Sequence, residues 1–256
     1  TTPKESPRVA ATLQSVNAMA TATQSRRGSM ICVDDFLAAA HYDVRVINAV
    51  ADVGREGRAN HEPRDSRESR MSKVLAVVGS PRKGGNTEIL VSRIAEGAAS
   101  VAAAVEMVRL GDLHIRECDG CHACWRGPPC SKDDDMRPLY EKIAACDVLV
   151  FATPVYWYGP TALMKAFVDR FVYFNCEANR PMVRGKRAAA AVVLEETREE
   201  TWRPVVDFFR KSLAYLEMNL TDIIVVPGVG DKGAIRRESQ RLEEARRLGA
   251  VLATSS

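Results

Sequence analysis

The sequence predicts an α/β domain centred on a doubly wound parallel sheet of five strands in the order 2-1-3-4-5. The first observation behind this prediction is that five short apolar runs alternate with segments of helical spacing from Lys73 onward. Such alternation is typical of a parallel sheet with helices on both faces. The second is that runs such as "KVLAVVG" are apolar without interruption, as expected of strands buried on both faces. Five strands of this kind suit the doubly wound order.

The predicted elements follow one another in chain order. The strands are expected at 73–79, 105–110, 147–153, 187–194 and 221–229. The helices are expected at 86–101, 136–146, 161–174, 197–216 and 239–253. Asn86 or Thr87 is expected to cap the first helix. Pro160 and Thr161 open the third helix, and Pro204 interrupts or begins the fourth.

Residues 1–70 have a different composition and are predicted to form a poorly ordered extension and linker. Their last part, "REGRANHEPRDSRESR", mixes charges and has almost nothing to bury, so it cannot offset its ordering entropy. The domain is expected at 71–256, with Met71 as its natural start. The extension is either a targeting segment or, as the alternative, a dispensable tail or an over-extended gene start, and these alternatives stay open.

Composition excludes several classes of protein. The formal net charge of +3 is too small to argue for a nucleic-acid partner. No apolar run is long enough to span a bilayer. Seven cysteines, four of them crowded into one loop, do not resemble a disulfide framework. A reducing, cytoplasmic setting is therefore expected, where clustered cysteines bind metal or do redox work.

Three unusual loops follow the first three predicted strands: "GSPRKGGNT", a cysteine-rich loop, and "TPVYWYGPT". In open parallel sheets, ligands bind outside the carboxyl ends of the strands, where the strand order reverses. In the predicted order this point lies between the first and third strands. The sequence therefore predicts that these loops form the functional site.

The first loop has the features of a phosphate cradle. It joins a strand to a helix, its glycines allow close approach of the backbone, and the helix N-terminus adds free N–H groups and a positive dipole end. The loop is neither a Walker A motif nor a G-x-G-x-x-G fingerprint. A plain glycine-rich turn is the alternative. The residues expected to bind the phosphate group or approach it are Ser80, Arg82, Gly85, Asn86 and Thr87.

The loop after the third strand places three consecutive aromatic residues at a strand's carboxyl end, where they are costly to expose. A flat heteroaromatic ring could lie against it, although a dimer contact or a local core is the alternative. A ring and a phosphate bound side by side suggest a mononucleotide, with FMN as the candidate. The residues expected to line the ring are Pro154, Val155, Tyr156, Trp157, Tyr158 and Gly159.

Four stretches together resemble the flavodoxin-like family of NAD(P)H-dependent FMN reductases and iron–sulfur flavoproteins: "GSPRKGGNTE", "CDGCHACWRGPPCSKDDDM", "TPVYWYGPTALMKAFVDR" and "GVGDKGAI". The resemblance covers about residues 72–252. It implies that Ser80, Arg82, Asn86 and Thr87 hold the FMN phosphate and that 154–159 line the isoalloxazine. One departure is the acidic "EETREET" after the fourth strand, where many flavodoxin-like proteins place small residues against the flavin.

The cysteine loop has the spacing C-x2-C-x2-C-x5-C, formed by Cys118, Cys121, Cys124 and Cys130. Compact spacing suits a [4Fe-4S] cluster, and the family resemblance supports that interpretation. Zinc is a second alternative, although structural zinc generally takes its second pair from a distant knuckle. Bare thiols that shape a substrate pocket or cycle with an oxidant are a third. His122 is expected to face solvent, Cys146 and Cys176 to lie in the core or a helix, and Cys32 lies outside the domain.

The sequence thus predicts an FMN-dependent oxidoreductase that takes electrons from NAD(P)H and passes them to a quinone, a metal, a ferredoxin-type carrier or another acceptor. The alternatives are an electron carrier without small-molecule turnover and a phosphate-binding module without flavin. No catalytic side chain can be named from the sequence, since the flavin carries such chemistry. A homodimer or homotetramer is expected. "DDDM" is expected to begin a helix, and Lys165, Asp169 and Arg170 to form an ion pair.

Overall fold

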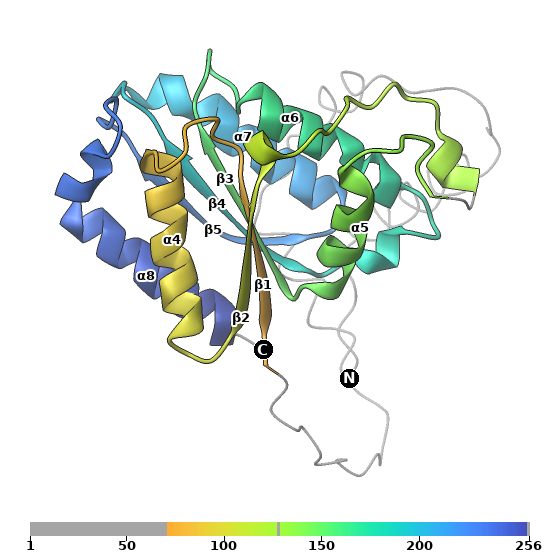
Figure 1. The fold of residues 1–256 in the computed structure, drawn as a ribbon, viewed down its shortest axis with the longest axis horizontal. Coiled ribbons are helices and arrows are strands. Elements are labelled where there is room, and N and C mark those ends of the chain that lie inside the picture. The colour runs from red at the N-terminus through yellow and green to blue at the C-terminus, as the bar shows by residue number, and fades with distance from the viewer. Residues whose placement is uncertain (1–70, 127–128, 255–256) are drawn as a thin grey trace, which may run out of the picture. The chain divides into compact units, whose positions relative to one another are not determined.

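The computed structural model describes residues 71–126 and 129–254, so the prediction for residues 1–70 lies outside the described part. All neighbouring strands pair in parallel, in the order β2-β1-β3-β4-β5. The predicted fold class and strand order are therefore confirmed (Figure 1). The strands are β1 (Lys73–Val78), β2 (Ala104–Arg109), β3 (Val148–Pro154), β4 (Arg187–Val193) and β5 (Asn219–Val226).

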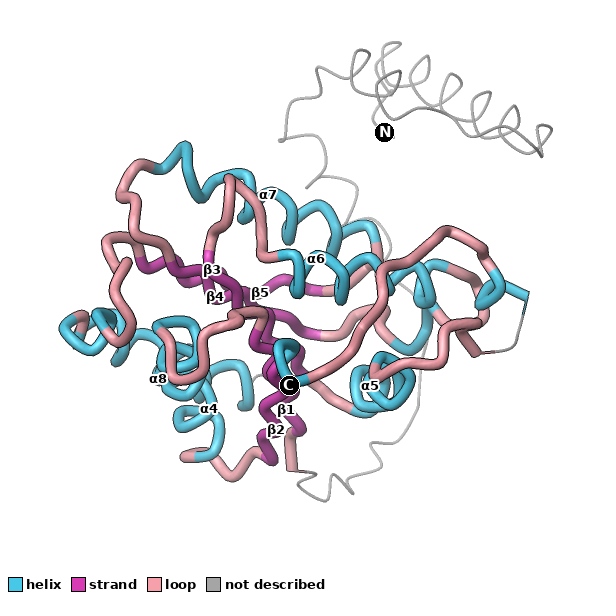
Figure 2. Tube along the Cα trace, turned by 45° about the horizontal axis from the view of Figure 1, so that its top comes forward, coloured by secondary structure: helices cyan, strands magenta, loops and turns pink. Residues whose placement is uncertain are grey.

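Helices cover both faces of this sheet. One face carries α4 (Asn86–Ala99) and α8 (Ser239–Thr254), and the other carries α5 (Met136–Ala145), α6 (Ala162–Asp169) and α7 (Glu199–Tyr215), as Figures 1 and 2 show. Side chains of the inner strands alternate between the two layers: Leu75 and Val77 of β1 join one apolar core, and Val74, Ala76 and Val78 join the other. Within the described residues, no helix combines the length and the apolar character needed to cross a membrane.

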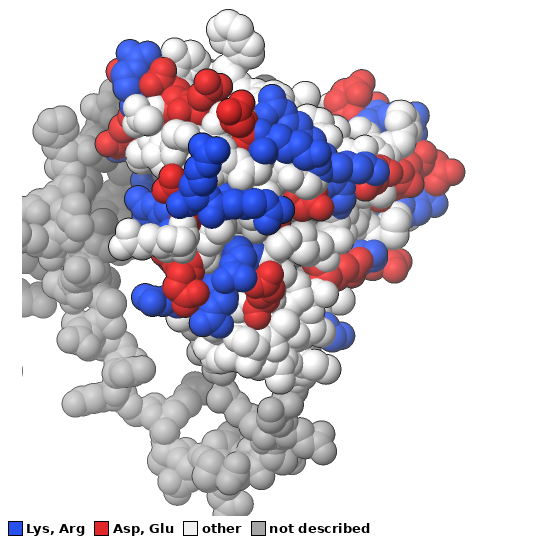
Figure 3. All heavy atoms as spheres, turned by 60° about the vertical axis from the view of Figure 1, so that its left-hand side comes forward, with Lys and Arg blue, Asp and Glu red and all other residues white. Residues whose placement is uncertain are grey.

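Two glycines bring α4 and α8 into direct backbone contact. A Cβ atom added at Gly97 would overlap the carbonyl oxygen of Arg246, and one added at Gly249 would overlap that of Ile94. The outer surface of this layer carries mixed charges (Figure 3), including the ion pairs Arg241–Glu244 at 2.8 Å and Arg246–Glu243 at 3.1 Å on α8. The glycine contact fixes the position of α4, and with it the loop that precedes the helix.

Three predicted boundaries differ from the structure. Gly85, rather than Asn86 or Thr87, is the N-cap of α4, and it supplies no side-chain hydrogen bond. The helix expected over 161–174 ends at Asp169 and continues as a 3-10 helix from Arg170 to Asn175. The helix around Pro204 is continuous from Glu199. By contrast, Thr161 caps α6 as expected, because its hydroxyl accepts a hydrogen bond from the Met164 N–H at 3.1 Å.

Candidate functional site

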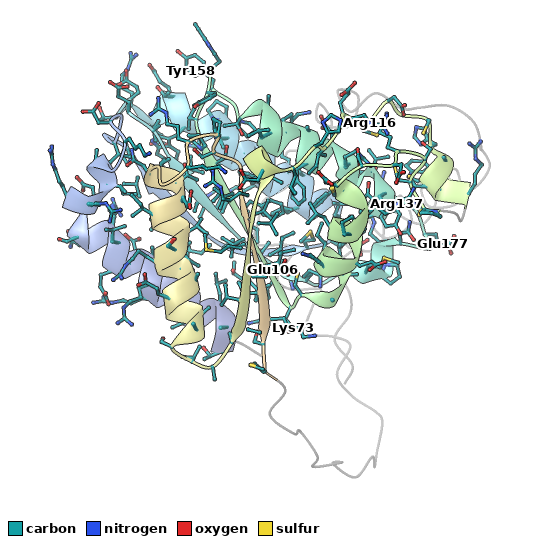
Figure 4. All side chains as sticks on the ribbon, viewed as in Figure 1. Lys73, Glu106, Arg116, Arg137, Tyr158 and Glu177 are labelled. Atoms are coloured by element: carbon teal, nitrogen blue, oxygen red, sulfur yellow. The ribbon has the colours of Figure 1, made fainter. Side chains whose placement is uncertain are left out.

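The loops after β1, β3, β4 and β5 surround one cleft at the carboxyl edge of the sheet. Figure 4 shows the orientation: Tyr158, in the loop after β3, stands at the opposite end of the domain from Lys73, where β1 begins. The cleft has a volume of about 130 Å³. Its lining residues are Ser80, Arg82, Asn86, Thr87, Pro154, Val155, Tyr156, Val193, Leu194, Glu195, Val229 and Gly230.

The glycine-rich loop is shaped by hydrogen bonds within itself. The Arg82 N–H donates to Ser80 Oγ at 3.3 Å, and the Gly85 N–H donates to the Arg82 carbonyl at 3.1 Å. Gly84 has a φ of 64°, a left-handed conformation that favours glycine, and its N–H donates to Glu88 Oε2 at 2.9 Å. The loop therefore turns tightly into the first turn of α4 and brings backbone N–H groups to the cleft.

Asn86 has a structural task that the sequence did not reveal. Its Nδ2 donates to the carbonyls of Val229 at 2.9 Å and Asp231 at 2.8 Å, and its Oδ1 accepts from the Ile235 N–H at 3.3 Å. Its side-chain amide thus ties the start of α4 to the loop after β5. In this structure the Asn86 side chain links α4 to the segment that follows β5. Its predicted contact with a phosphate stays a prediction.

Arg82 brings a positive charge to the same cleft. Its backbone is fixed by Ser80, while its side chain is exposed and reaches across to donate from Nη1 to the Gly230 carbonyl at 3.2 Å. This contact is a single hydrogen bond to a backbone carbonyl. The guanidinium has further N–H groups with which to bind an anion.

The aromatic loop divides into a part that lines the cleft and a part that does not. Tyr156 and Gly159 exchange backbone hydrogen bonds of 2.9 and 3.0 Å across a tight turn. The two residues between them, Trp157 and Tyr158, have φ values of 48° and 62°. Such values are unusual for aromatic residues and are strained. Trp157 is 95% exposed, so in this structure its ring faces solvent while Pro154, Val155 and Tyr156 line the cleft.

Five lining residues were not among the predicted site residues: Val193, Leu194, Glu195, Val229 and Gly230, which follow or end β4 and β5. Glu195 lies in the acidic segment that departs from the family pattern. A signal for them was available, because the carboxyl ends of all strands of a parallel sheet lie at the same edge.

The cysteine loop lies beside the 3-10 helix Arg170–Asn175. The Trp125 indole Nε1 donates to the Val172 carbonyl at 2.8 Å, and Cys176 Sγ lies 3.9 Å from the Cys124 carbonyl. Cys124 is buried, and burial, together with the nearby Cys130 thiol, raises its pKa to about 11. Cys121 is exposed and contacts Ser131 at 3.3 Å.

In the ranges 71–126 and 129–254, no three His, Cys, Asp or Glu side chains are gathered closely enough to hold a metal ion. The loop supplies the four thiols that an iron–sulfur cluster needs, but here they do not converge. Cys121 is exposed, whereas Cys124 is buried. His122 is exposed as predicted, and it packs edge-on against Trp125 with ring centroids 4.2 Å apart.

Arg170 joins this loop to the body of the domain. Its side chain has no exposed surface and pairs with the equally buried Asp134 at 2.5 Å. It also donates to the Arg116 carbonyl at 3.0 Å and to Cys130 Sγ at 3.3 Å. Burial alone would raise the pKa of Asp134, but hydrogen bonds from Arg170 and from the Arg116 N–H outweigh it and lower that pKa.

The predicted ion pair among Lys165, Asp169 and Arg170 is thus only partly correct. Lys165 and Asp169 pair on the surface at 2.6 Å, whereas Arg170 turns inward to Asp134. Asp134 belongs to the "DDDM" stretch, whose expected role as the start of a helix is confirmed by α5. Its carboxylate also accepts from the Met136 N–H at 3.2 Å.

Comparison with known proteins points to one family. A profile of the family described as NADPH-dependent FMN reductase matches residues 72–218. An iron–sulfur flavoprotein of Methanocaldococcus jannaschii is 28% identical over 192 residues, which are 71% of this chain and 95% of that protein. An iron–sulfur flavoprotein of Archaeoglobus fulgidus is 40% identical over 98 residues, or 38% of this chain. The match spans about half, 48%, of that relative's length.

The fold has a counterpart among solved structures. The NAD(P)H:quinone oxidoreductase from Methanothermobacter marburgensis superposes with a TM-score of 0.59, covering 73% of this chain and 98% of that one, at 18% identity. At this identity the likeness concerns the fold alone. The family profile matches more than half of the 256 residues, and the motifs in the first and third loops lie around one cleft. The chain therefore belongs to the family of NADPH-dependent FMN reductases.

Proposed function

We propose that the chain binds FMN in the cleft and passes electrons from NAD(P)H to an acceptor such as a quinone, a metal or a ferredoxin-type carrier. The observation that carries the proposal is that the glycine-rich loop, the start of α4 and residues 154–156 line a single cleft. This arrangement sets an anion site beside an apolar wall, as a nucleotide with a phosphate and a flat ring requires.

The residues of the cleft fit the parts of FMN. Ser80, in the loop after β1, and Thr87, in the first turn of α4, are buried polar residues near the helix N-terminus, where the dipole favours negative charge. Arg82 adds a guanidinium for the phosphate oxygens. Pro154, Val155 and Tyr156 offer apolar surface to a ring. When bound, FMN supplies a ring that accepts hydride, and the protein supplies position and charge.

The test of this proposal is a visible spectrum of the purified full chain followed by titration of the apoprotein with FMN, monitored by flavin fluorescence. Arg82→Ala is expected to weaken binding about tenfold or more, because a charge-assisted hydrogen bond contributes about 1.5–3 kcal/mol. Lys83→Ala is the matched control. It removes the same charge one residue away, from a side chain that is 75% exposed and pairs with Asp112 at 2.8 Å. A colourless protein with no affinity for FMN would contradict the proposal.

Turnover distinguishes an enzyme from an electron carrier. The proposed enzyme oxidises NADH or NADPH in steady state when an acceptor such as a benzoquinone is present. A flavin-loaded protein that is reduced only by a partner protein would be the carrier instead. We further propose a homodimer or homotetramer, supported by Tyr156, Trp157 and Tyr158, which are 43%, 95% and 54% exposed beside the cleft. A cytoplasmic setting is proposed from the clustered cysteines. Light scattering of the holoprotein tests the assembly.

We also propose that the cysteine loop takes up a [4Fe-4S] cluster, supported by its four-thiol spacing and by the names of the M. jannaschii and A. fulgidus relatives. In this structure, no three of these thiols lie closely enough together to hold a metal ion. Anaerobically prepared protein is expected to contain about four iron atoms per chain. Cys121→Ala should remove the iron and leave FMN bound, whereas Cys146→Ala, in the core, should remove neither. Iron absent after reconstitution with iron and sulfide would leave the bare-thiol alternative.

A further inference from the structure

Two backbone hydrogen bonds of the preceding residue, Leu194, fix the position of Glu195 in the cleft. Glu195 follows the buried residues Val193 and Leu194 at the carboxyl end of β4. The Leu194 N–H donates to the Val226 carbonyl at 3.2 Å, and the Leu194 carbonyl accepts from the Val229 N–H at 2.9 Å. The chain therefore leaves the sheet in a set direction, and Glu195 is the first exposed residue beyond it, on the wall of the cleft.

Gly230 leaves the space that the Glu195 side chain fills. A Cβ atom at Gly230 would lie 2.6 Å from Glu195 Cδ and 2.8 Å from its Oε2, closer than real contacts allow. The carbonyl of the same glycine accepts the hydrogen bond from Arg82 at 3.2 Å. The Glu195 carboxylate and the Arg82 guanidinium thus both lie against Gly230. The absence of a side chain at Gly230 makes room for the carboxylate.

The negative charge of the Glu195 carboxylate has no partner of opposite charge among the described residues. Throughout the described part of the chain, no cationic group lies within 4.0 Å of it, and its oxygens accept no hydrogen bond. Its neighbour Glu196 differs: it accepts from the Thr197 N–H at 2.9 Å, contacts Arg198 at 3.7 Å, and does not line the cleft. Within the described residues, the cleft wall therefore carries a carboxylate without a salt bridge, and this carboxylate lies against the same glycine as Arg82 of the loop that we assign to the anionic phosphate.

We propose that Glu195 sets the electron affinity of the flavin in this cleft, by opposing the negative charge that reduction brings to the ring. This inference rests on the proposed function. A hydride from NAD(P)H delivers two electrons and one proton, and NAD(P)⁺ leaves, so the ring gains one unit of negative charge. A second proton from water cancels that charge. A carboxylate on the cleft wall makes the added charge unfavourable, and the protein thereby holds a more strongly reducing flavin.

Three single substitutions test the proposal in the flavin-loaded full chain. Glu195→Gln removes the charge with almost no change in shape. Gly230→Ala keeps the charge but pushes the carboxylate out of its place. Glu196→Gln removes an equal charge one residue away, outside the cleft. The measurement is the redox equilibrium of the bound flavin with a reference dye at constant pH, read from the flavin and dye spectra.

Glu195→Gln is expected to shift this equilibrium about fivefold towards reduced flavin, the scale of one unit charge acting through water at about 4 Å. Gly230→Ala is expected to shift it in the same direction by less, and Glu196→Gln to change it little. The double variant Glu195→Gln/Gly230→Ala should match Glu195→Gln alone, because the glycine acts through the carboxylate.

An unchanged equilibrium in Glu195→Gln, with FMN bound as in the wild type, would overturn this proposal and leave the proposed function intact. An equal shift in Glu196→Gln would also overturn it, because the effect would then come from surface charge in general. Failure of the wild-type protein to bind FMN would overturn both proposals together. The FMN titration of the wild type separates these outcomes before any redox measurement is made.

Discussion

The glycine-rich loop and the cysteine loop lie at the same edge of the sheet, but they are held in different ways. The turn of the first is shaped by hydrogen bonds between near neighbours, such as Gly85 to Arg82 at 3.1 Å and Gly84 to Glu88 at 2.9 Å. Distant contacts of Asn86 and Arg82 then tie this turn to the loop after β5. The second is held by residues about forty positions away, through Arg170 and Val172. The comparison teaches that a locally shaped loop can be recognised from sequence, whereas a loop held at a distance can be understood only from the fold.

The largest effect is expected from Arg170→Met, which breaks the support of the cysteine loop. The substitution leaves the Asp134 carboxylate buried without its cation, and such losses cost about 3–5 kcal/mol of unfolding free energy. Urea denaturation measures it. Lys165→Met is the matched control: its pair with Asp169 is exposed, with an expected cost of about 0.3–0.5 kcal/mol. Equal losses in the two variants would show that the buried pair does not hold the loop.

Arg170→Met should also change how stability depends on pH. The folded protein lowers the pKa of Asp134 below its unfolded value. The resulting stabilisation is complete above the unfolded pKa, about 3.9, and is lost as the pH falls through the folded value. Without Arg170 its hydrogen bond and charge no longer lower this pKa, although the bonds from the Arg116 and Met136 N–H groups remain. The variant should therefore lose less of its remaining stability than the wild type between about pH 5 and pH 2. Parallel acid profiles would contradict this account.

A smaller effect is expected from Gly97→Ala. This substitution tests whether the contact between α4 and α8 supports the glycine-rich loop. Alanine favours a helix over glycine by about 1 kcal/mol, but here its Cβ would overlap the Arg246 carbonyl and push α8 from α4. The free energy of unfolding should therefore fall by about 1–3 kcal/mol. FMN binding should also weaken, because α4 begins at the cleft. Gly111→Ala is the control, since its nearest neighbours would lie 3.7 Å away. Thermal unfolding and FMN titration measure both, and a stabilised Gly97→Ala would refute the contact.

The smallest effect is expected from Trp125→Phe. It keeps an aromatic ring but removes the indole N–H that donates to the Val172 carbonyl at 2.8 Å. The free energy of unfolding should fall by about 0.5–1.5 kcal/mol. The cysteines of the loop should then react faster with a thiol reagent. Trp157→Phe makes the same chemical change at a residue that is 95% exposed, and it should leave stability unchanged. If both variants behave alike, the Trp125 hydrogen bond does not hold the loop.

The strand order and all ten main elements could be predicted because they depend on apolar patterns that repeat along the chain. The tight turn of the glycine-rich loop could be recognised because its glycines lie between a strand and a helix, and phosphate binding there stays a prediction. The inward turn of Arg170 could not be predicted, since its partner Asp134 is 36 positions away and looked like an ordinary helix start. The turn at Trp157 was not predicted either, because its left-handed φ of 48° belongs to a turn type that usually takes asparagine or glycine.

The contacts of Asn86 have a consequence for the order of events during synthesis. Ribosomes deliver the chain from its N-terminus, so the glycine-rich loop emerges well before its clamps at Val229, Asp231 and Ile235, which lie 143 to 149 positions later. A nascent chain that ends short of these residues can form β1 and α4 but cannot secure the junction between the loop and the helix. Tight capture of FMN is therefore expected to be a late event, and a truncated chain should not sequester the vitamin-derived cofactor from the cell's supply.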